Sequence, residues 1–360
     1  MQKQILKSSR EEVEKNSRLN NKELDERKII LESYPRSLFV QLDAPCNQDC
    51  LFCSRPESYS HFELEKFKNT YLDKLEPALC KAERINLTGS GELLFLPEAK
   101  EILEFFNSYK YAEKMFATNG SSLTPKMADF IAESENRYTL HVSLHASKKE
   151  IHEKMTKSKS YDAVKWNLEH LRKVDRKNLT VNFVFLATQA NIHDLPDFAK
   201  FAKDYNASSV IVYYNYIYRP DQKGISCYFI KENTNRIFDL AKEEAEKLNL
   251  LLVLPPKFGS KEASSQICAE AWSDLMINPR GDILTCDVAG DSNESLNGKE
   301  FMEAWNGKYY MDIRKKLSKG EYSCSRYCFR ANPSAVNDLR AHTITRGKTE
   351  TEIYEMVSEL

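Results

Sequence analysis

The sequence predicts an α/β fold in which helices cover a parallel sheet that is either doubly wound or closed into a partial barrel. Apolar segments of strand length alternate with helical segments about six times along the chain, a pattern typical of parallel sheets. The alternation stops near Leu251, and a linker-like stretch after Phe258 leads into a smaller region that contains cysteines. A chain of 360 residues is long enough for one large catalytic domain with such an appendage.

The elements follow in order from their apolar patterns. Residues 1–36 are rich in charge and predict a helical lead-in packed loosely on the main body, and residues 331–360 predict a polar tail. Between them we expect the sheet domain at 37–258 and the cysteine region at 259–330. Strands are expected at 37–43, 84–88, 114–118, 138–144, 179–187 and 208–214. Helices are expected at 97–109, 125–133, 161–174, 195–205 and 233–247.

Composition argues against several classes of function. The 52 Lys and Arg residues nearly balance 53 Asp and Glu residues, so no global positive field attracts nucleic acid or an anionic membrane. The N-terminus has no apolar signal segment, and no apolar stretch approaches the roughly 18 residues of a membrane span. We therefore expect a cytoplasmic protein. In that reducing compartment, nine cysteines indicate metal binding or chemistry rather than disulfides.

Three of these cysteines form a compact group directly after the first expected strand. Cys46, Cys50 and Cys53 have the spacing C-x3-C-x2-C, which can wrap three thiolates around one corner of a cluster. A structural zinc site normally closes with four ligands, whereas three cysteines on an iron-sulfur cube leave one iron open. The group predicts an open catalytic cluster, with structural metal or unrelated buried thiols as the alternatives.

This spacing, with Phe52 before the last cysteine, resembles the signature of the radical S-adenosylmethionine (SAM) superfamily. Three further stretches resemble that family in the same order, namely LTGSGELL at 87–94, ATNGS at 117–121 and VSLHA at 142–146. The resemblance implies a partial (β/α)6 barrel with a 4Fe-4S cluster on the three cysteines and SAM bound to the open iron. It also implies reductive cleavage of SAM to a 5'-deoxyadenosyl radical, which abstracts hydrogen from an unactivated C–H bond.

The resemblance assigns roles to individual side chains near this cluster. The glycines at 89 and 91 would let the backbone approach the methionine moiety, and Glu92 would accept from its ammonium group. Ser143 would meet the methionine carboxylate. Many relatives have an arginine in the stretch after the fourth strand, where this chain has Lys157 as a possible substitute. The cofactor-binding set expected from the resemblance is Phe52, Gly89, Ser90, Gly91, Glu92, Ser143 and Lys157.

A second group of cysteines lies in the last quarter of the chain. A hairpin is expected around a turn at Pro279, followed by a helical segment from Trp305 to Leu317. This layout resembles the auxiliary region called twitch, which is related to the longer SPASM domain. The resemblance implies a second, auxiliary 4Fe-4S cluster, with structural zinc as the alternative. Its expected ligands are Cys268, Cys286, Cys324 and Cys328.

The two remaining cysteines, Cys80 and Cys227, have no partners by spacing and are expected to be small buried hydrophobes, with hydrogen-atom donation as the alternative. Four residues near expected strand ends either touch substrate or belong to ordinary packing. They are His145, Tyr213, Asn215 and Arg219. No catalytic residue is assigned.

The expected activity is oxidation of a small biosynthetic substrate such as a sugar or aminocyclitol, with electrons from a donor such as flavodoxin or ferredoxin. Only 45 residues precede Cys46, and they lack the strand pattern of a leader-binding domain, which favours a small molecule. A peptide or protein maturase that forms thioethers, crosslinks, epimers or oxidised side chains is the alternative. A metal-stabilised binding module without enzyme activity is the third class.

Overall fold

The computed structural model describes residues 8–53, 61–261, 268–286, 292, 294–321, 328–329, 331–343, 355 and 358. The strands of this part of the chain form one nine-stranded sheet in the order β7-β6-β5-β4-β3-β2-β1-β8-β9. Neighbours from β7 to β8 run parallel, and β9 runs antiparallel to β8. The strands are β1 Ser37–Val40, β2 Arg84–Asn86, β3 Glu113–Thr118, β4 Tyr138–Ser143, β5 Leu179–Ala187, β6 Ser209–Tyr214, β7 Leu251–Val253, β8 Asp274–Ile277 and β9 Ile283–Leu284.

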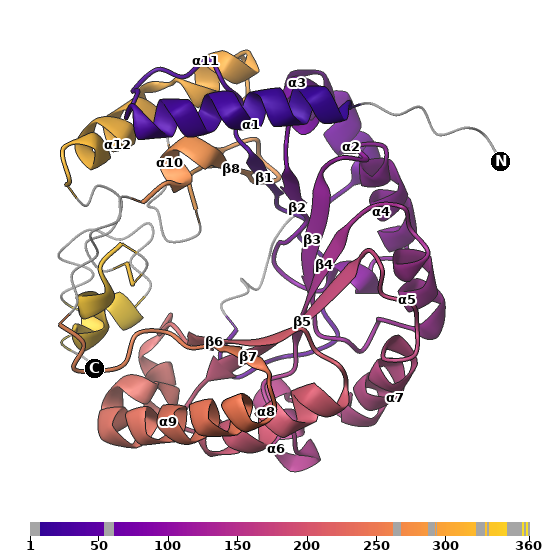
Figure 1. Cartoon of the computed structure of the whole chain (residues 1–360), viewed down its shortest axis with the longest axis vertical. Coiled ribbons are helices and arrows are strands. Elements are labelled where there is room, and N and C mark those ends of the chain that lie inside the picture. The colour runs from indigo at the N-terminus through magenta and orange to yellow at the C-terminus, as the bar shows by residue number, and fades with distance from the viewer. Residues whose placement is uncertain are drawn as a thin grey trace.

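The sheet curves into an open barrel whose outer face is covered by helices (Figure 1). The expected alternation of strands and helices from β1 to β6 is therefore confirmed, and the architecture is a partial barrel. The helices are α1 Arg10–Asp25, α2 Leu64–Phe67, α3 Asp73–Leu79, α4 Ala99–Asn107, α5 Pro125–Ala132, α6 Lys149–Thr156, α7 Tyr161–Leu171, α8 Leu195–Asp204, α9 Lys231–Lys247, α10 Glu270–Ser273, α11 Phe301–Trp305 and α12 Lys308–Ser318.

Local sequence explains how the barrel helices begin. Helix α5 starts at Pro125, whose ring suits the first helical position, and the Thr124 hydroxyl accepts a hydrogen bond from the backbone N–H of Met127. Helix α4 begins at Ala99, two residues later than its expected start at Pro97, because the backbone N–H of Ala99 bonds to Leu96 in a turn. Both helices bury an apolar face against the sheet, as their periodicity predicts.

The expected hairpin around Pro279 is confirmed by the antiparallel pair β8 and β9. Gly281 lies in its turn with φ of +85°, a left-handed conformation that favours glycine. Strand β8 also pairs in parallel with β1 along its whole length, from Ser37 opposite Asp274 to Val40 opposite Ile277. The hairpin that separates Cys268 from Cys286 therefore continues the barrel sheet beside β1.

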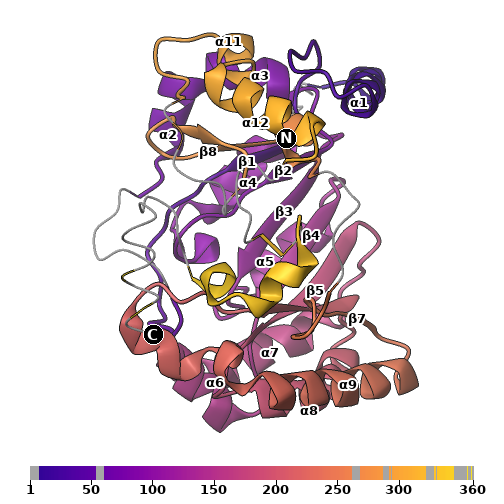
Figure 2. The same cartoon turned by 90° about the vertical axis from the view of Figure 1, so that its left-hand side faces the viewer.

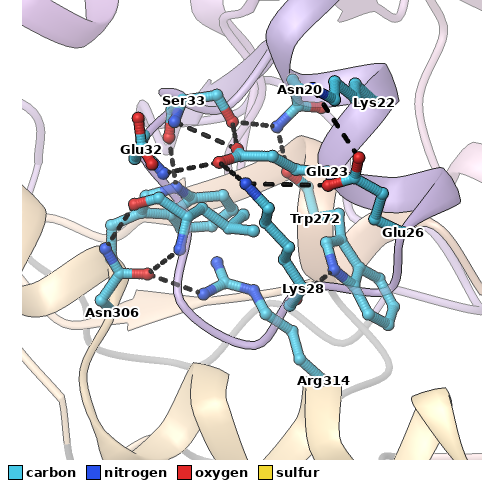
Figure 3. A network of polar contacts seen from close by, with 12 residues as sticks. Asn20, Lys22, Glu23, Glu26, Lys28, Glu32, Ser33, Trp272, Asn306 and Arg314 are labelled. Atoms are coloured by element: carbon cyan, nitrogen blue, oxygen red, sulfur yellow. Dashed lines mark hydrogen bonds and ion pairs between the residues drawn. The ribbon is translucent and has the colours of Figure 1, made fainter.

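Helix α1 is held firmly against the barrel, so the loose packing expected for it is wrong. Asn20 and Glu23 are fully buried in this helix. The Asn20 amide donates to the Ser33 hydroxyl and to the Trp272 carbonyl, at 2.8 and 2.7 Å. The Glu23 carboxylate accepts from the backbone N–H groups of Glu32 and Ser33 (Figure 3). Polar residues that resemble a solvated helix face instead bond to buried backbone, which periodicity does not reveal.

Arg314 of α12 connects the C-terminal helices to the chain before β1. Its guanidinium is fully buried and donates to the carbonyls of Ala271 and Ile29, at 2.8 and 3.1 Å. It also donates to the side-chain oxygen of Asn306 at 3.1 Å (Figure 3). The same group lies 4.3 Å from the centre of the Trp305 ring. Helices α1, α11 and α12 consequently gather at one end of the molecule, while α6, α8 and α9 lie at the other (Figure 2).

Residues 331–343 cross back to the carboxyl end of β6. The backbone N–H of Ile217 donates to the His342 carbonyl at 2.7 Å, and Ile217 forms a parallel bridge with Thr343. The His342 ring packs against the rings of Tyr214 and Phe258, with centroid distances of 5.2 and 5.4 Å. The expected tail helix lies almost entirely outside the described residues. None of the helices in the described part is both long and apolar enough to span a membrane.

Candidate active site

The loop that contains Cys46, Cys50 and Cys53 leaves the carboxyl end of β1, the edge where parallel barrels carry their functional groups. It is fixed by backbone hydrogen bonds along its length. The N–H groups of Asp49 and Leu51 donate to carbonyls at the end of α6, at 3.1 and 2.9 Å. Bonds to a helix C-terminus hold the loop in one conformation and also satisfy carbonyls that the helix leaves unpaired.

The thiols of Cys53 and Cys46 lie near enough to Cys50 to affect its ionisation. Burial, followed by the nearby Cys53 and Cys46, raises the pKa of Cys50 to about 12. Iron binds thiolates, so a bound cluster would have to supply the positive charge that offsets this crowding. Among the described residues, no three Cys, His, Asp or Glu side chains are arranged to hold a single metal ion. A 4Fe-4S cube differs from a single ion, because each cysteine binds a different iron atom, and three thiols in one loop are the donors that such a cube takes.

The glycine-containing loop after β2 packs directly on the chain that leads into Cys46. A Cβ atom on Gly89 would lie 2.4 Å from the Leu42 carbonyl oxygen, and one on Gly91 only 1.7 Å from the Ala44 oxygen. Gly91 also has φ of +97°, which disfavours any side chain. Contact between two chain segments therefore requires both glycines, whether or not their backbone also approaches SAM.

Glu92 is buried, with 2% of its surface exposed, and its carboxylate is already bonded within the protein. It accepts from the Thr118 hydroxyl at 2.8 Å and from the backbone N–H of Asn119 at 2.6 Å. Burial raises the pKa of Glu92 to about 6. The side chain thus ties the loop after β2 to the end of β3, and binding of the SAM ammonium group stays a prediction for it.

Asn119 joins the same network and was not assigned a role from the sequence. Its amide nitrogen donates to the Asn47 side chain at 2.9 Å and lies 4.0 Å from the sulfur of Cys46. The Asn47 amide in turn donates to the Ser121 hydroxyl at 2.8 Å. The sequence signal that could have identified Asn119 is the stretch at 117–121, which resembles a family motif. Its asparagine links the turn after β3 to the first cysteine.

Ser143 and Lys157 approach the site from β4 and α6. Ser143 is the last residue of β4 and is half-buried, while Lys157 ends α6 in the left-handed conformation with φ of +48°. The Lys157 ammonium lies 3.5 Å from the Asp49 carboxylate and is half-exposed. This ion pair is weak because water screens it. The Lys157 ammonium can therefore turn from Asp49 toward the carboxylate of a molecule bound beside the cysteine loop.

Phe52 packs against His145, with ring centroids 4.8 Å apart at 85°. Among the four residues considered for substrate contact, His145 and Asn215 are buried, while Tyr213 is 43% exposed and Arg219 pairs with Asp221. The structure thus brings His145 to the cysteine loop, a contact that spacing along the chain does not reveal.

The C-terminal cysteines are placed only in part. Cys268 precedes α10 and Cys286 follows β9, so the hairpin separates them. The Cys328 carbonyl accepts from the backbone N–H of Asn332 at 2.8 Å, and the neighbouring Phe329 ring stacks on Tyr216 near the end of β6. Cys324 lies outside the described residues. The four-cysteine site therefore stays a prediction.

The positions of Cys80 and Cys227 favour packing roles. Cys80 follows α3, which leads to the amino end of β2. It therefore lies at the amino ends of the strands, whereas the cysteine triplet lies at their carboxyl ends. Cys227 is 1% exposed within the core, and burial raises its pKa to about 12. Neither position favours the alternative of hydrogen-atom donation.

Comparison with known proteins agrees with this geometry. Residues 45–202 match the model of the Radical SAM superfamily. A probable GTP 3',8-cyclase from Methanocaldococcus jannaschii is 27% identical over 223 residues, which cover 59% of this chain and 68% of that protein. The segment at 45–202 that matches the family model includes the cysteine triplet, the glycine loop and Ser143.

Solved structures extend the likeness to most of the chain. SuiB from Streptococcus suis bound to S-adenosylmethionine has a TM-score of 0.63 at 15% identity, covering 93% of this chain and 79% of that one. The protein anSMEcpe with bound AdoMet and Cp18Cys peptide has a TM-score of 0.60 at 17% identity, covering 90% and 95%. At such identities the likeness concerns the fold. Together with the family match over residues 45–202, the site resembles that of a radical SAM domain, and the protein is an enzyme.

Proposed function

We propose that Cys46, Cys50 and Cys53 hold a 4Fe-4S cluster with one iron open to SAM. The observation that carries this proposal is a loop of three neighbouring thiols at the carboxyl end of β1, inside the segment that matches the radical SAM model. When bound, this cofactor pair supplies a 5'-deoxyadenosyl radical able to abstract hydrogen from a C–H bond. The protein's own groups then have to orient SAM and substrate and exclude water.

The surrounding residues divide this work. Glu92 and Asn119 connect the glycine loop to the first cysteine. These contacts would fix the surface against which SAM lies. Ser143 and Lys157 would meet the carboxylate of SAM, with a hydroxyl from the end of β4 and an ammonium from the end of α6. Phe52 covers the side of the loop that faces His145.

The proposed reaction is the oxidation of a small biosynthetic substrate such as a sugar or aminocyclitol. A second cluster on Cys268, Cys286, Cys324 and Cys328 would take up the electron of the substrate radical, and flavodoxin or ferredoxin would supply the reducing electron. The sequence relative supports a small substrate, since the GTP in its name is a small molecule. Structural zinc at these four cysteines is the alternative outcome.

Modification of a peptide is the second candidate. One specific observation favours it. The structures of similar fold include SuiB bound to the precursor peptide SuiA. The match to that structure covers 95% of this chain, with a TM-score of 0.62 at 14% identity.

Anaerobically reconstituted enzyme with SAM and a chemical reductant separates the two candidates. We expect 5'-deoxyadenosine formation to rise above its uncoupled rate when the low-molecular-mass fraction of the source cells is added. A rise only with the peptide and protein fraction would establish the second candidate instead. Absence of 5'-deoxyadenosine under all conditions, with the cluster assembled, would refute both.

A further inference from the structure

His145 has an unusual conformation for its position directly beyond β4. It is 7% exposed, and its φ of +63° places a residue with a side chain in the left-handed region. Such a conformation is unfavourable unless the surroundings enforce it. Here the Asn191 amide donates to the His145 carbonyl at 2.7 Å and to the Leu186 carbonyl at 2.9 Å. The fully buried Asn191 thereby locks the turn after β4 to the end of β5.

The His145 ring is locked as well. The backbone N–H of Leu186 donates to Nδ1 of His145 at 3.0 Å, so the ring proton lies on Nε2. Burial lowers the pKa of His145 to about 3, which agrees with a neutral ring. Because Nδ1 is bonded to strand backbone, the ring cannot rotate without leaving a buried N–H unpaired.

The locked ring meets Phe52 edge to face, 4.8 Å away at 85°. Phe52 lies one position before Cys53, so the contact fixes the end of the cysteine loop. The turn after β5 also contacts Met155, which in turn holds Leu51, the residue before Phe52. The Thr188 hydroxyl lies 3.6 Å from the sulfur of Met155, and the Met155 carbonyl accepts from the Leu51 backbone N–H at 2.9 Å.

We propose that His145 is a positioning residue that sets the orientation of Phe52 and Cys53, and hence the stability of the cluster at its third cysteine. This role differs from substrate contact, because it acts through Phe52. It rests on the proposed function to the extent that a cluster binds at the triplet. An edge-to-face ring pair contributes about 0.5–1.5 kcal/mol, which corresponds to about a two- to tenfold effect on a rate.

The variant His145→Asn isolates this role. Asparagine tolerates the left-handed backbone, and its side-chain oxygen can accept the Leu186 N–H in place of Nδ1, so only the ring that meets Phe52 is lost. Phe52→Leu removes the same contact from the other side. His141→Asn is the matched control, because it makes the same substitution in β4, away from the loop. Thermal unfolding of all three variants verifies that the fold is retained.

Two measurements are informative. In metal-free protein, hydrogen exchange at the amides of Phe52 and Cys53 should be about two- to tenfold faster in His145→Asn and in Phe52→Leu than in wild type. In reconstituted protein, the SAM-responsive EPR signal should decay in a ferrous chelator faster by a similar factor. The double variant should show no more than the larger single effect, and His141→Asn should match wild type.

The outcomes separate the two proposals. Wild-type rates in His145→Asn, or effects that multiply in the double variant, would overturn the positioning role while the cluster assignment stands. A wild-type protein that assembles a cluster without any SAM-responsive signal would overturn the proposed function, whereas the exchange rates of the metal-free variants would still decide the positioning role.

Discussion

The two cysteine groups are held in very different ways. Cys46, Cys50 and Cys53 lie within one short loop, which backbone bonds to α6, a side-chain contact from Asn119 and the Phe52 ring hold in place. The C-terminal cysteines that the structure describes come from separate segments: Cys268 precedes α10, Cys286 follows β9, and Cys328 adjoins Phe329, whose ring stacks on Tyr216 after β6. The compact group depends on local bonds within the barrel, whereas a site formed by the dispersed cysteines would depend on how separate segments of the chain pack together. Variants should therefore separate the two sites.

The largest expected effect comes from the triplet itself. Replacing Cys46, Cys50 and Cys53 together by Ala should remove about half of the iron and abolish reductive cleavage of SAM, because no ligand for the open cluster remains. Iron, sulfide and 5'-deoxyadenosine assays on anaerobically reconstituted protein measure this. Cleavage of SAM by the triple variant would refute the assignment of the triplet.

The converse replacement tests the dispersed group. Changing Cys268, Cys286, Cys324 and Cys328 to Ala should leave SAM cleavage intact and abolish substrate turnover, since an electron acceptor would be lost. Iron analysis should again show a loss of about half. Full occupancy by zinc in protein isolated without oxygen from iron-replete cells would show that the region is structural.

Gly91→Ala should damage the compact site through its packing. The new methyl group would lie 1.7 Å from the Ala44 oxygen at a φ of +97°, so the free energy of unfolding should fall by about 3 kcal/mol or more. Urea unfolding measures the loss. Gly224→Ala is the matched control, because a Cβ there meets nothing within 4 Å. Equal stability of the two variants would contradict the described docking of the glycine loop.

Acidity should affect the compact site through Glu92. Burial raises the pKa of Glu92 in the folded protein from 4.5 to about 6, so the folded state favours the protonated carboxyl. The resulting stabilisation is fully present below pH 4.5 and is lost as the pH rises through 6. The free energy of unfolding of wild type, relative to Glu92→Gln, should therefore fall by about 2 kcal/mol over this window. Parallel pH profiles for the two proteins would show that Glu92 is not buried as described.

The smallest effect is expected where α1 contacts α10. Asn20→Ala removes the donor to the Trp272 carbonyl in α10 and should reduce the free energy of unfolding by about 1–2 kcal/mol. Asn21→Ala changes the same residue type at the next, exposed position of α1 and should have little effect. If both variants unfold alike in urea, α1 does not anchor the C-terminal region through Asn20.

The same contrast explains what the sequence reveals. Strands β1 to β6, helices α4, α5 and α7 to α9, and the hairpin follow from local patterns and were predicted closely, whereas β7 and the helices α2, α3 and α6 were not predicted. The burial of Asn20 and Glu23 could not be predicted, because their partners lie elsewhere in the chain or in backbone groups. Gly91 was assigned to ligand approach, whereas its contact with Ala44 requires knowledge of the fold. The role of Asn119 was signalled only by its motif.

The central claim is that the triplet binds a cluster with an iron open to SAM. EPR spectroscopy of the reduced variant that lacks Cys268, Cys286, Cys324 and Cys328 tests it most directly, because only the triplet can then bind iron. We expect the signal of one reduced 4Fe-4S cluster, whose g-values shift when SAM is added. A cluster signal that SAM leaves unchanged, or no cluster signal in folded protein, would contradict the claim.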